Sequence, residues 1–160
     1  AAPPRPRCDE GGKGNAAGLA SPKKMIVLVC GGRNYSDRAS LFNSLDRLER
    51  EIGKPFRGLI HGAAKGADRL AAEWQALRII YNKQLWSAGY PADWDKHGPA
   101  AGPIRNQHML DSNPGIELVV SFPGGRGTAD MVRRAKVKGL TVIEVESTIP
   151  IDKKMKSIYP

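Results

Sequence analysis

Short apolar runs alternate with longer segments of helical spacing from Met25 onward, and this alternation constrains the fold more than any other feature. MIVLVC (25–30) is continuously apolar, as strands buried on both faces of a parallel sheet are. RGLI (57–60), KQLWSAGY (83–90), IELVVSF (116–122) and LTVIEV (140–145) predict four further strands. Because helices between parallel strands form crossover connections, we predict an α/β fold with a doubly wound, mostly parallel, Rossmann-like five-stranded sheet.

Helices are predicted between these strands from capping residues and from the spacing of apolar residues. The first begins after Ser36 or Asp37, and its apolar face comprises Leu41, Phe42, Leu45, Leu48 and Ile52. The second runs from Gly66 to about Ile80 and is expected to bury Leu70, Trp74 and Leu77. The last two cover AGPIRNQHML (101–110) and Thr128 to Lys138.

The length of 160 residues suits one domain, which we place at 25–147. Residues 1–24 are rich in Pro, Gly and Ala, which predicts a disordered tail, and 148–160 are a second tail. The net charge is +9, of which residues 1–24 contribute +3 (5 basic minus 2 acidic) and 151–160 contribute +2 (3 minus 1). The remaining +4 suits an anionic ligand, although solvated surface lysines explain it equally well.

Several classes of protein are excluded by what the sequence lacks. No apolar run approaches the roughly 20 residues of a membrane helix, and the N-terminus has no signal-peptide core, so we expect a cytoplasmic protein without a membrane partner. Cys8 and Cys30 are expected to be reduced thiols. Three histidines and two cysteines show no ligand spacing, so no metal and no cofactor is expected.

The unusual residues all follow strands. GGRNYSD (31–37), HGAAKGAD (61–68), PADWDKHG (91–98) and PGGRGTAD (123–130) come after the first four strands, whereas the segments before strands are ordinary turns. Because the carboxyl ends of parallel strands share one edge, these four loops should meet where ligands bind to such sheets. The sequence therefore predicts a binding site at this edge.

The chemistry of these loops is that of a phosphate or nucleotide site. Glycines let backbone N–H groups approach an anion closely, and the expected contacts are Gly31, Gly32, Gly62, Gly66, Pro123, Gly124, Gly125 and Gly127. Arg33 supplies charge, and Thr128 adds a hydroxyl at a helix N-terminus. A single such loop is equally well explained as a tight turn, but three on one edge favour a ligand. The spacings match neither Walker A nor G-x-G-x-x-G, so ATP hydrolysis and dinucleotide redox chemistry are not indicated.

Four other side chains in these loops carry two interpretations each. Asp68 and Asp130 lie near helix starts, where a carboxylate offsets the helix dipole. The alternative is that they contact a ribose hydroxyl or act catalytically. The dipole role is favoured for Asp68, and the two roles are equally open for Asp130. His61 either faces the ligand or is structural. Trp94 either stacks on a base or covers its loop, and Met131 is expected to pack inward.

Four stretches together resemble the YspA-like branch of the SLOG superfamily, which joins DprA (Smf) with the LOG phosphoribohydrolases. They are VLVCGGRNYSD (27–37), LIHGAAKGADRLAAEW (59–74), YPADWDKHGPAAGPIRNQHML (90–110) and VVSFPGGRGTADMVRRA (119–135). The resemblance implies a Rossmann-like sheet that binds a nucleotide or nucleotide-derived ligand, in a branch found in bacteria and phages.

The resemblance to LOG enzymes also implies specific residues. Their P-G-G-x-G-T-x-x-E motif is matched at Pro123 to Thr128, and Arg105, next to Asn106 in GPIRNQ, resembles their arginine. Met131 stands where the glutamate would be, and a thioether cannot ionise or relay a proton. Asp130 can substitute only if the helix start presents it to the ligand, because one residue is about 100° around a helix.

Three functions follow, in this order. The first is nucleotide binding or sensing, in which Arg33, Arg105 and Asn106 join the loops. The second is a LOG-like nucleotide N-glycosidase that uses Asp130 and Arg105. The third is single-stranded nucleic-acid binding, by analogy with DprA, although no aromatic and basic stripe is present. The resemblance to LOG proteins, which pair, also makes a homo-oligomer an expectation.

Overall fold

The computed structural model describes residues 24–146. Its elements run in the order β1 (Met25–Cys30), α1 (Arg38–Ile52), β2 (Phe56–His61), α2 (Ala67–Arg78), β3 (Trp86–Gly89), α3 (Trp94–His97), η1 (Gly98–Ala100), α4 (Ala101–Ser112), β4 (Ile116–Ser121), α5 (Arg126–Val137) and β5 (Thr141–Glu144). The predicted tails lie outside the described residues, apart from Lys24.

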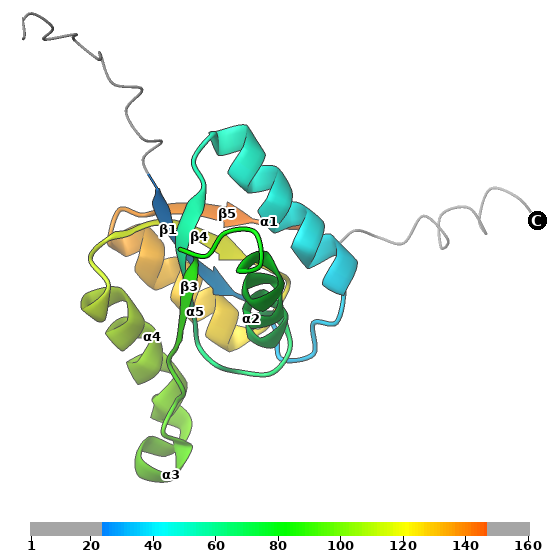
Figure 1. Cartoon of the computed structure of the whole chain (residues 1–160). Helices are drawn as coiled ribbons and strands as arrows, with labels where there is room; N and C mark the ends of the chain where they lie inside the picture. Colours follow the sequence, from blue (N-terminus) through cyan, green and yellow to red (C-terminus); the bar gives the residue numbers. More distant parts are fainter. Residues whose placement is uncertain (1–23, 147–160) are drawn as a thin grey trace, which may run out of the picture.

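The five strands form one sheet in the order β3-β2-β1-β4-β5, and every neighbouring pair is parallel (Figure 1). The chain builds outward from β1 to β3, then crosses to β4 and builds outward again. The strand order therefore reverses between β1 and β4. This confirms the predicted α/β, Rossmann-like sheet.

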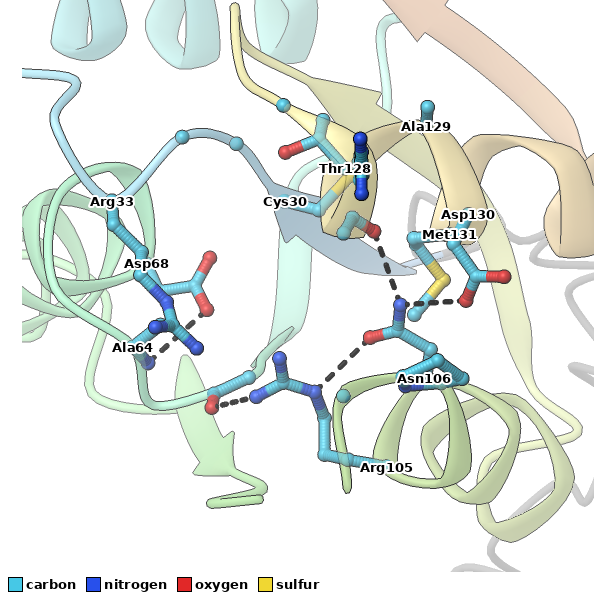
Figure 2. A pocket seen from close by; sticks show the side chains of 18 of the residues that line it. Cys30, Arg33, Ala64, Asp68, Arg105, Asn106, Thr128, Ala129, Asp130 and Met131 are labelled. Carbon is cyan, nitrogen blue, oxygen red and sulfur yellow. Dashed lines mark hydrogen bonds between the residues drawn. The ribbon is translucent and has the colours of Figure 1, made fainter. Parts of the chain in front are cut away.

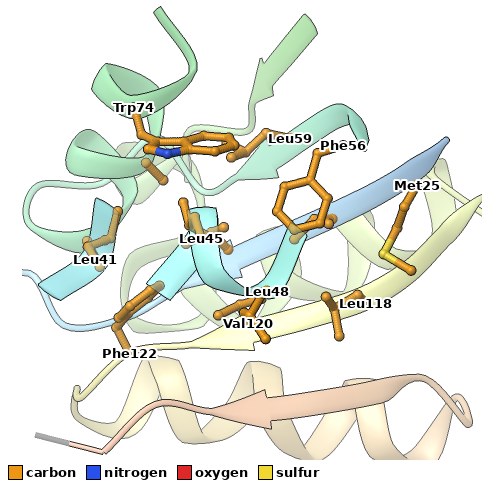
Figure 3. Close-up of a cluster of buried hydrophobic side chains, with 14 of the residues drawn as sticks. Met25, Leu41, Leu45, Leu48, Phe56, Leu59, Trp74, Leu118, Val120 and Phe122 are labelled. Atoms are coloured by element: carbon orange, nitrogen blue, oxygen red, sulfur yellow. The ribbon is translucent and has the colours of Figure 1, made fainter. Parts of the chain in front are cut away.

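Alternate residues of the central strands pack on opposite faces of the sheet. Val27 and Val29 join a core formed with α1 and α2, which contains Leu41, Leu45 and Trp74 (Figure 3). Leu28 and Cys30 join a second core formed with α4 and α5, which contains Met109, Leu110, Met131 and Ala135. The sheet is thus covered by two helices on each side.

Helix α1 begins where the capping residues predicted it. Asp37 is the cap, and its Oδ1 accepts the Ser40 N–H at 2.9 Å. The helix ends at Gly53, whose φ of 69° is the left-handed conformation that glycine adopts without strain. Leu41, Leu45 and Leu48 are buried, as the spacing predicted.

The prediction for the face of α2 was wrong at Leu77, which is 45% exposed. The buried stripe instead runs through Ala67, Ala71 and Trp74. Two alanines bring the helix close to the sheet and the indole fills the space beyond them, so Leu77 is turned away. Helix α5 starts at Arg126, two residues before the predicted Thr128. Within residues 24–146, no helix is both long and apolar enough to cross a bilayer.

Candidate functional site

A pocket of about 880 Å³ opens at the carboxyl edge of the sheet, beside the reversal between β1 and β4 (Figure 2). Three segments line it: the loops after β1 and β2 with the first turn of α2, the α3–α4 region, and the first turns of α5. The lining residues that the sequence had singled out are Gly31, Gly32, Arg33, Gly62, Asp68, Trp94, Arg105, Asn106, Gly125, Gly127, Thr128, Asp130 and Met131. The pocket therefore opens at the edge of the sheet where the sequence predicted a binding site.

Four of the predicted glycines are required by the packing of the loops against each other. A Cβ on Gly31 would lie 2.5 Å from the Ala67 Cβ, and one on Gly32 would lie 2.8 Å from the Pro123 carbonyl oxygen. Gly66 has a φ of 75° and packs on the Gly32 carbonyl, while Gly124 packs on Gly32 and on the Thr128 hydroxyl. These glycines join the loops after β1 and β4 to the start of α2.

Gly125 and Gly127 differ from the others because a Cβ on either would meet nothing within 4 Å. Gly125 caps α5 without a side-chain hydrogen bond to the helix. Helix geometry leaves the first N–H groups of α5, at Arg126, Gly127 and Thr128, without partners inside the helix. These residues line the pocket, so this helix start offers backbone donors and the positive end of the helix dipole to it.

Arg105 on α4 is held by three acceptors. Its Nε donates to the Asn106 Oδ1 at 3.0 Å, and its Nη1 donates to the carbonyl oxygens of Gly62 and, at 3.2 Å, Tyr90. Its Nη2 makes no hydrogen bond within residues 24–146. Burial lowers the pKa of Arg105, which the Asp68 carboxylate partly opposes. The side chain stays a cation with two N–H groups to donate.

Asp68, in the first turn of α2, is 5% exposed and lines the pocket. Burial raises the pKa of its carboxyl from the usual 3.8 to about 6, although the Ala64 N–H and the Arg105 charge oppose that rise. The Ala64 N–H donates to Oδ2 at 3.2 Å. Asp68 can thus hold a proton close to neutral pH.

Asp130, in α5, is held by three donors. The Asn106 Nδ2 donates to it at 3.0 Å, Arg133 at 2.6 Å and Arg134 at 2.8 Å. Burial raises the pKa of Asp130, but the hydrogen bonds from Arg134, Asn106 and Arg133 outweigh it, and the pKa lies below its usual value. Asp130 reaches the edge of the pocket as an ionised group that joins α5 to α4.

Four predicted contacts do not line this pocket. His61 is 8% exposed, and its Nδ1 accepts the Ala63 N–H at 3.1 Å within the turn after β2. Burial lowers the pKa of His61, so the ring is neutral. Gly66 faces Gly32, while Pro123 and Gly124 line a separate hollow of about 230 Å³ beside β5.

Other lining residues were not anticipated as parts of a site. Cys30 and Met109, both buried, join Met131 in an apolar wall, and burial raises the pKa of the Cys30 thiol to about 12. A sequence signal existed for Cys30, since it ends β1 at the binding edge. Arg126, the first residue of α5, and Arg133, two turns further along that helix, also line the pocket.

Trp94 and Arg33 meet above the pocket. The Arg33 guanidinium lies 4.7 Å from the centroid of the Trp94 ring, a cation–π contact between the loop after β1 and α3. Arg33, Arg105, Arg126 and Arg133 together outnumber the two aspartates of the lining, so the pocket is positively charged. Among residues 24–146, no group of three His, Cys, Asp or Glu side chains could hold a metal ion.

Comparisons with known proteins agree with this fold. The profile of the YspA, cpYpsA-related SLOG family matches residues 25–97. The Gene 61 protein of Mycobacterium phage D29 is 35% identical over 122 residues, which are 73% of this chain and 93% of that protein. The X-ray structure of TM1055 has a TM-score of 0.53 at 21% identity, covering 78% of this chain and 75% of that one, and shows the same fold. The chain belongs to the YspA/cpYpsA-related SLOG family, as its loop motifs predicted.

Proposed function

We propose that the pocket binds a nucleotide or nucleotide-derived molecule and that the protein acts as a binding or sensing module. The observation that carries this proposal is the convergence of donors in one pocket: the open N-terminus of α5, the free Nη2 of Arg105, and Arg33. Backbone amides at a helix start and arginine guanidinium groups are the usual ligands of phosphate.

The rest of the pocket suits the remainder of such a molecule. Its volume of about 880 Å³ lies in the range of small-molecule sites. Met109 and Met131 give one apolar side, and Trp94, which is 45% exposed, offers a ring face once Arg33 turns to a phosphate. Asp68 can accept a hydrogen bond from a ribose hydroxyl or a base amino group. The pocket therefore has groups suited to the phosphate of a nucleotide and a partly apolar region suited to its base.

Two observations favour binding over hydrolysis. Met131 is 1% exposed, lies where LOG enzymes place a glutamate, and has no group that transfers a proton. Asp130, the neighbouring carboxylate, is engaged by Asn106, Arg133 and Arg134. A base with three donors and a lowered pKa is a weak proton acceptor.

The test is isothermal titration of the full-length chain with AMP, ADP-ribose, NAD and cyclic nucleotides, with chromatography of each mixture for released base. A ligand at a hundredfold excess over its Kd stabilises the fold by about 2.7 kcal/mol, so thermal unfolding provides a second readout. We expect at least one of these molecules to bind and to be recovered intact.

Arg33→Ala is expected to weaken that binding about tenfold or more, because it removes one charged hydrogen-bond donor of roughly 1.5–3 kcal/mol. Arg57→Ala is the matched control, since Arg57 is exposed on β2 and does not line the pocket. Equal losses in both variants, or no binding by any of the molecules, would contradict the proposal. Released base would make the protein a hydrolase.

A further inference from the structure

Asn106 on α4 uses every polar atom of its side chain to connect two other parts of the site (Figure 2). It is 3% exposed. Its Oδ1 accepts the Arg105 Nε–H at 3.0 Å, and its Nδ2 donates to the Gly127 carbonyl at 3.1 Å and to the Asp130 Oδ2 at 3.0 Å. A buried amide with all its groups paired has one fixed orientation.

The bond to Arg105 decides where that guanidinium points. An arginine side chain is long and flexible, and ordering it costs conformational entropy. With Nε held by Asn106 and Nη1 held by the Gly62 and Tyr90 carbonyls, the planar group has no freedom left. The remaining nitrogen, Nη2, points into the pocket (Figure 2).

The other two bonds hold the start of α5. Gly127 is the second residue of this helix and Asp130 is the fifth. The Asn106 amide is therefore hydrogen-bonded to the beginning of α5. That turn carries the N–H groups that line the pocket. The single Asn106 side chain therefore stands between the two donor groups proposed to hold the ligand's anion.

We propose that Asn106 is a positioning residue of the anion site, which sets Arg105 and the first turn of α5 at a fixed separation. The inference rests on the proposed function and deepens it, because Asn106 was predicted only as one of the ligand contacts. Donors that are already oriented before binding lose less entropy when the ligand arrives. Asn106 thus acts through Arg105 and α5, and direct contact with the ligand is not needed.

Gln107, the next residue of α4, is a matched comparison. Its Oε1 accepts the Arg134 Nη1–H at 2.9 Å, so it also joins α4 to α5, and its Nε2 donates to Asp111 at 2.9 Å. It makes no hydrogen bond to Arg105 and does not line the pocket. A variant at Gln107 therefore loosens the same pair of helices without touching either donor group.

The first experiment needs no ligand. In ¹⁵N NMR spectra of the full-length chain, the Arg105 Nε–H should exchange slowly with water because it is bonded to Asn106. Asn106→Ala is expected to speed that exchange at least tenfold, whereas Gln107→Ala is expected to change it less than twofold. An Nε–H signal that is unaltered in Asn106→Ala would overturn the proposal, whatever the protein binds.

Asn106→Asp tests the bond to Arg105 separately from the bonds to α5. It also serves as the test variant if Asn106→Ala does not fold. It keeps the shape and the oxygen that Arg105 uses, but it replaces the donor to Gly127 and Asp130 with a carboxylate oxygen. Slow exchange at the Arg105 Nε–H should persist, while the amide signals of Gly127 and Thr128 shift. Unchanged amide signals of Gly127 and Thr128 would overturn the proposal that Asn106 positions the start of α5.

The second experiment is a double-variant cycle on the affinity for whichever of AMP, ADP-ribose, NAD and the cyclic nucleotides binds to the wild-type protein. Asn106→Ala and Arg105→Ala should each weaken binding at least tenfold, and Asn106→Ala should weaken it by a smaller factor in the Arg105→Ala background than in wild type, because only the effect through α5 then remains. Losses that multiply would show independent ligand contacts and overturn the proposal. If wild-type protein binds none of AMP, ADP-ribose, NAD and the cyclic nucleotides, the proposed function fails, whereas the exchange measurement still decides the role of Asn106.

Discussion

Two aspartates near the starts of two helices have opposite electrostatic environments in one pocket. Asp68 is buried with its charge poorly compensated, and its pKa is raised by that burial. Asp130, also partly buried, ends with a lowered pKa because two arginines and Asn106 bind it. Both residues were singled out in the sequence, where residue spacing gives no information on the burial that sets their pKa values. The arginine beside Asp68 is Arg105 on α4, which lies far from Asp68 in the sequence. The arginine beside Asp130 is Arg134, which lies one turn further along the same helix, α5.

The raised pKa of Asp68 predicts a pH dependence of stability. A carboxyl with a pKa of about 6 in the fold and about 3.8 when unfolded stabilises the protein below pH 4, and this contribution is lost as the pH rises through 6. At 1.36 kcal/mol per pKa unit the loss is about 3 kcal/mol. Asp68→Asn should remove this loss between pH 4 and 7, as measured by urea unfolding.

A ¹³C titration of the Asp68 carboxyl checks the same prediction directly. We expect a midpoint near pH 6, and Asp130 should titrate below its usual range in the same spectra. A midpoint for Asp68 at or below its usual value of 3.8 would mean that its carboxylate is stabilised by Arg105 at least as strongly as burial opposes it.

At the scale of elements, neighbouring glycines of one loop have different roles. A Cβ on Gly124 would press on Thr128 and lie 2.6 Å from the Gly32 nitrogen, whereas Gly125, with a φ of −98°, has open space. Gly124→Ala should therefore lower the free energy of unfolding by about 1–3 kcal/mol, the usual cost of overpacking. Gly125→Ala should lower it by less, at most about 0.5–1 kcal/mol, because alanine is a poorer N-cap residue than glycine but meets no clash here.

Chemical denaturation of the two variants beside wild type measures both values. The comparison is internally controlled, because both changes add one methyl group to the same loop. Similar stabilities for the two variants would show that the loops after β1 and β4 are not packed as described.

The central strands could be predicted from the sequence because strands buried on both faces are continuously apolar. Most helices could be predicted from their capping residues and the spacing of their apolar residues. β1 and β4 are buried almost throughout, whereas β3 and β5 lie at the edges of the sheet and carry exposed residues. Leu77 was wrongly predicted to be buried because the spacing of large apolar residues was used to choose the buried face of α2. In the structure two alanines, Ala67 and Ala71, lie on that face instead. Gly127 hid the true start of α5, because glycine was taken as a loop residue.

At the scale of the whole molecule, the site could be predicted to an edge of the sheet but not to its full lining. Parallel strands bring their following loops together whatever the side chains are, so the position of the pocket follows from topology. The approach of α4 to α5, which places Asn106 against Gly127 and brings Met109 and Met131 to one wall, depends on tertiary packing. Local sequence spacing carries no record of that distance.

The decisive measurement for a nucleotide site is chemical-shift mapping of the full-length chain with AMP, ADP-ribose, NAD and cyclic nucleotides. We expect the backbone amide signals of Gly127 and Thr128 and the Arg105 Nε–H signal to shift together, saturably, as at least one of these ligands is added. Arg57, on the exposed part of β2, should stay unchanged. Shifts confined to residues outside the pocket, or none at millimolar ligand, would contradict a nucleotide site at this edge of the sheet.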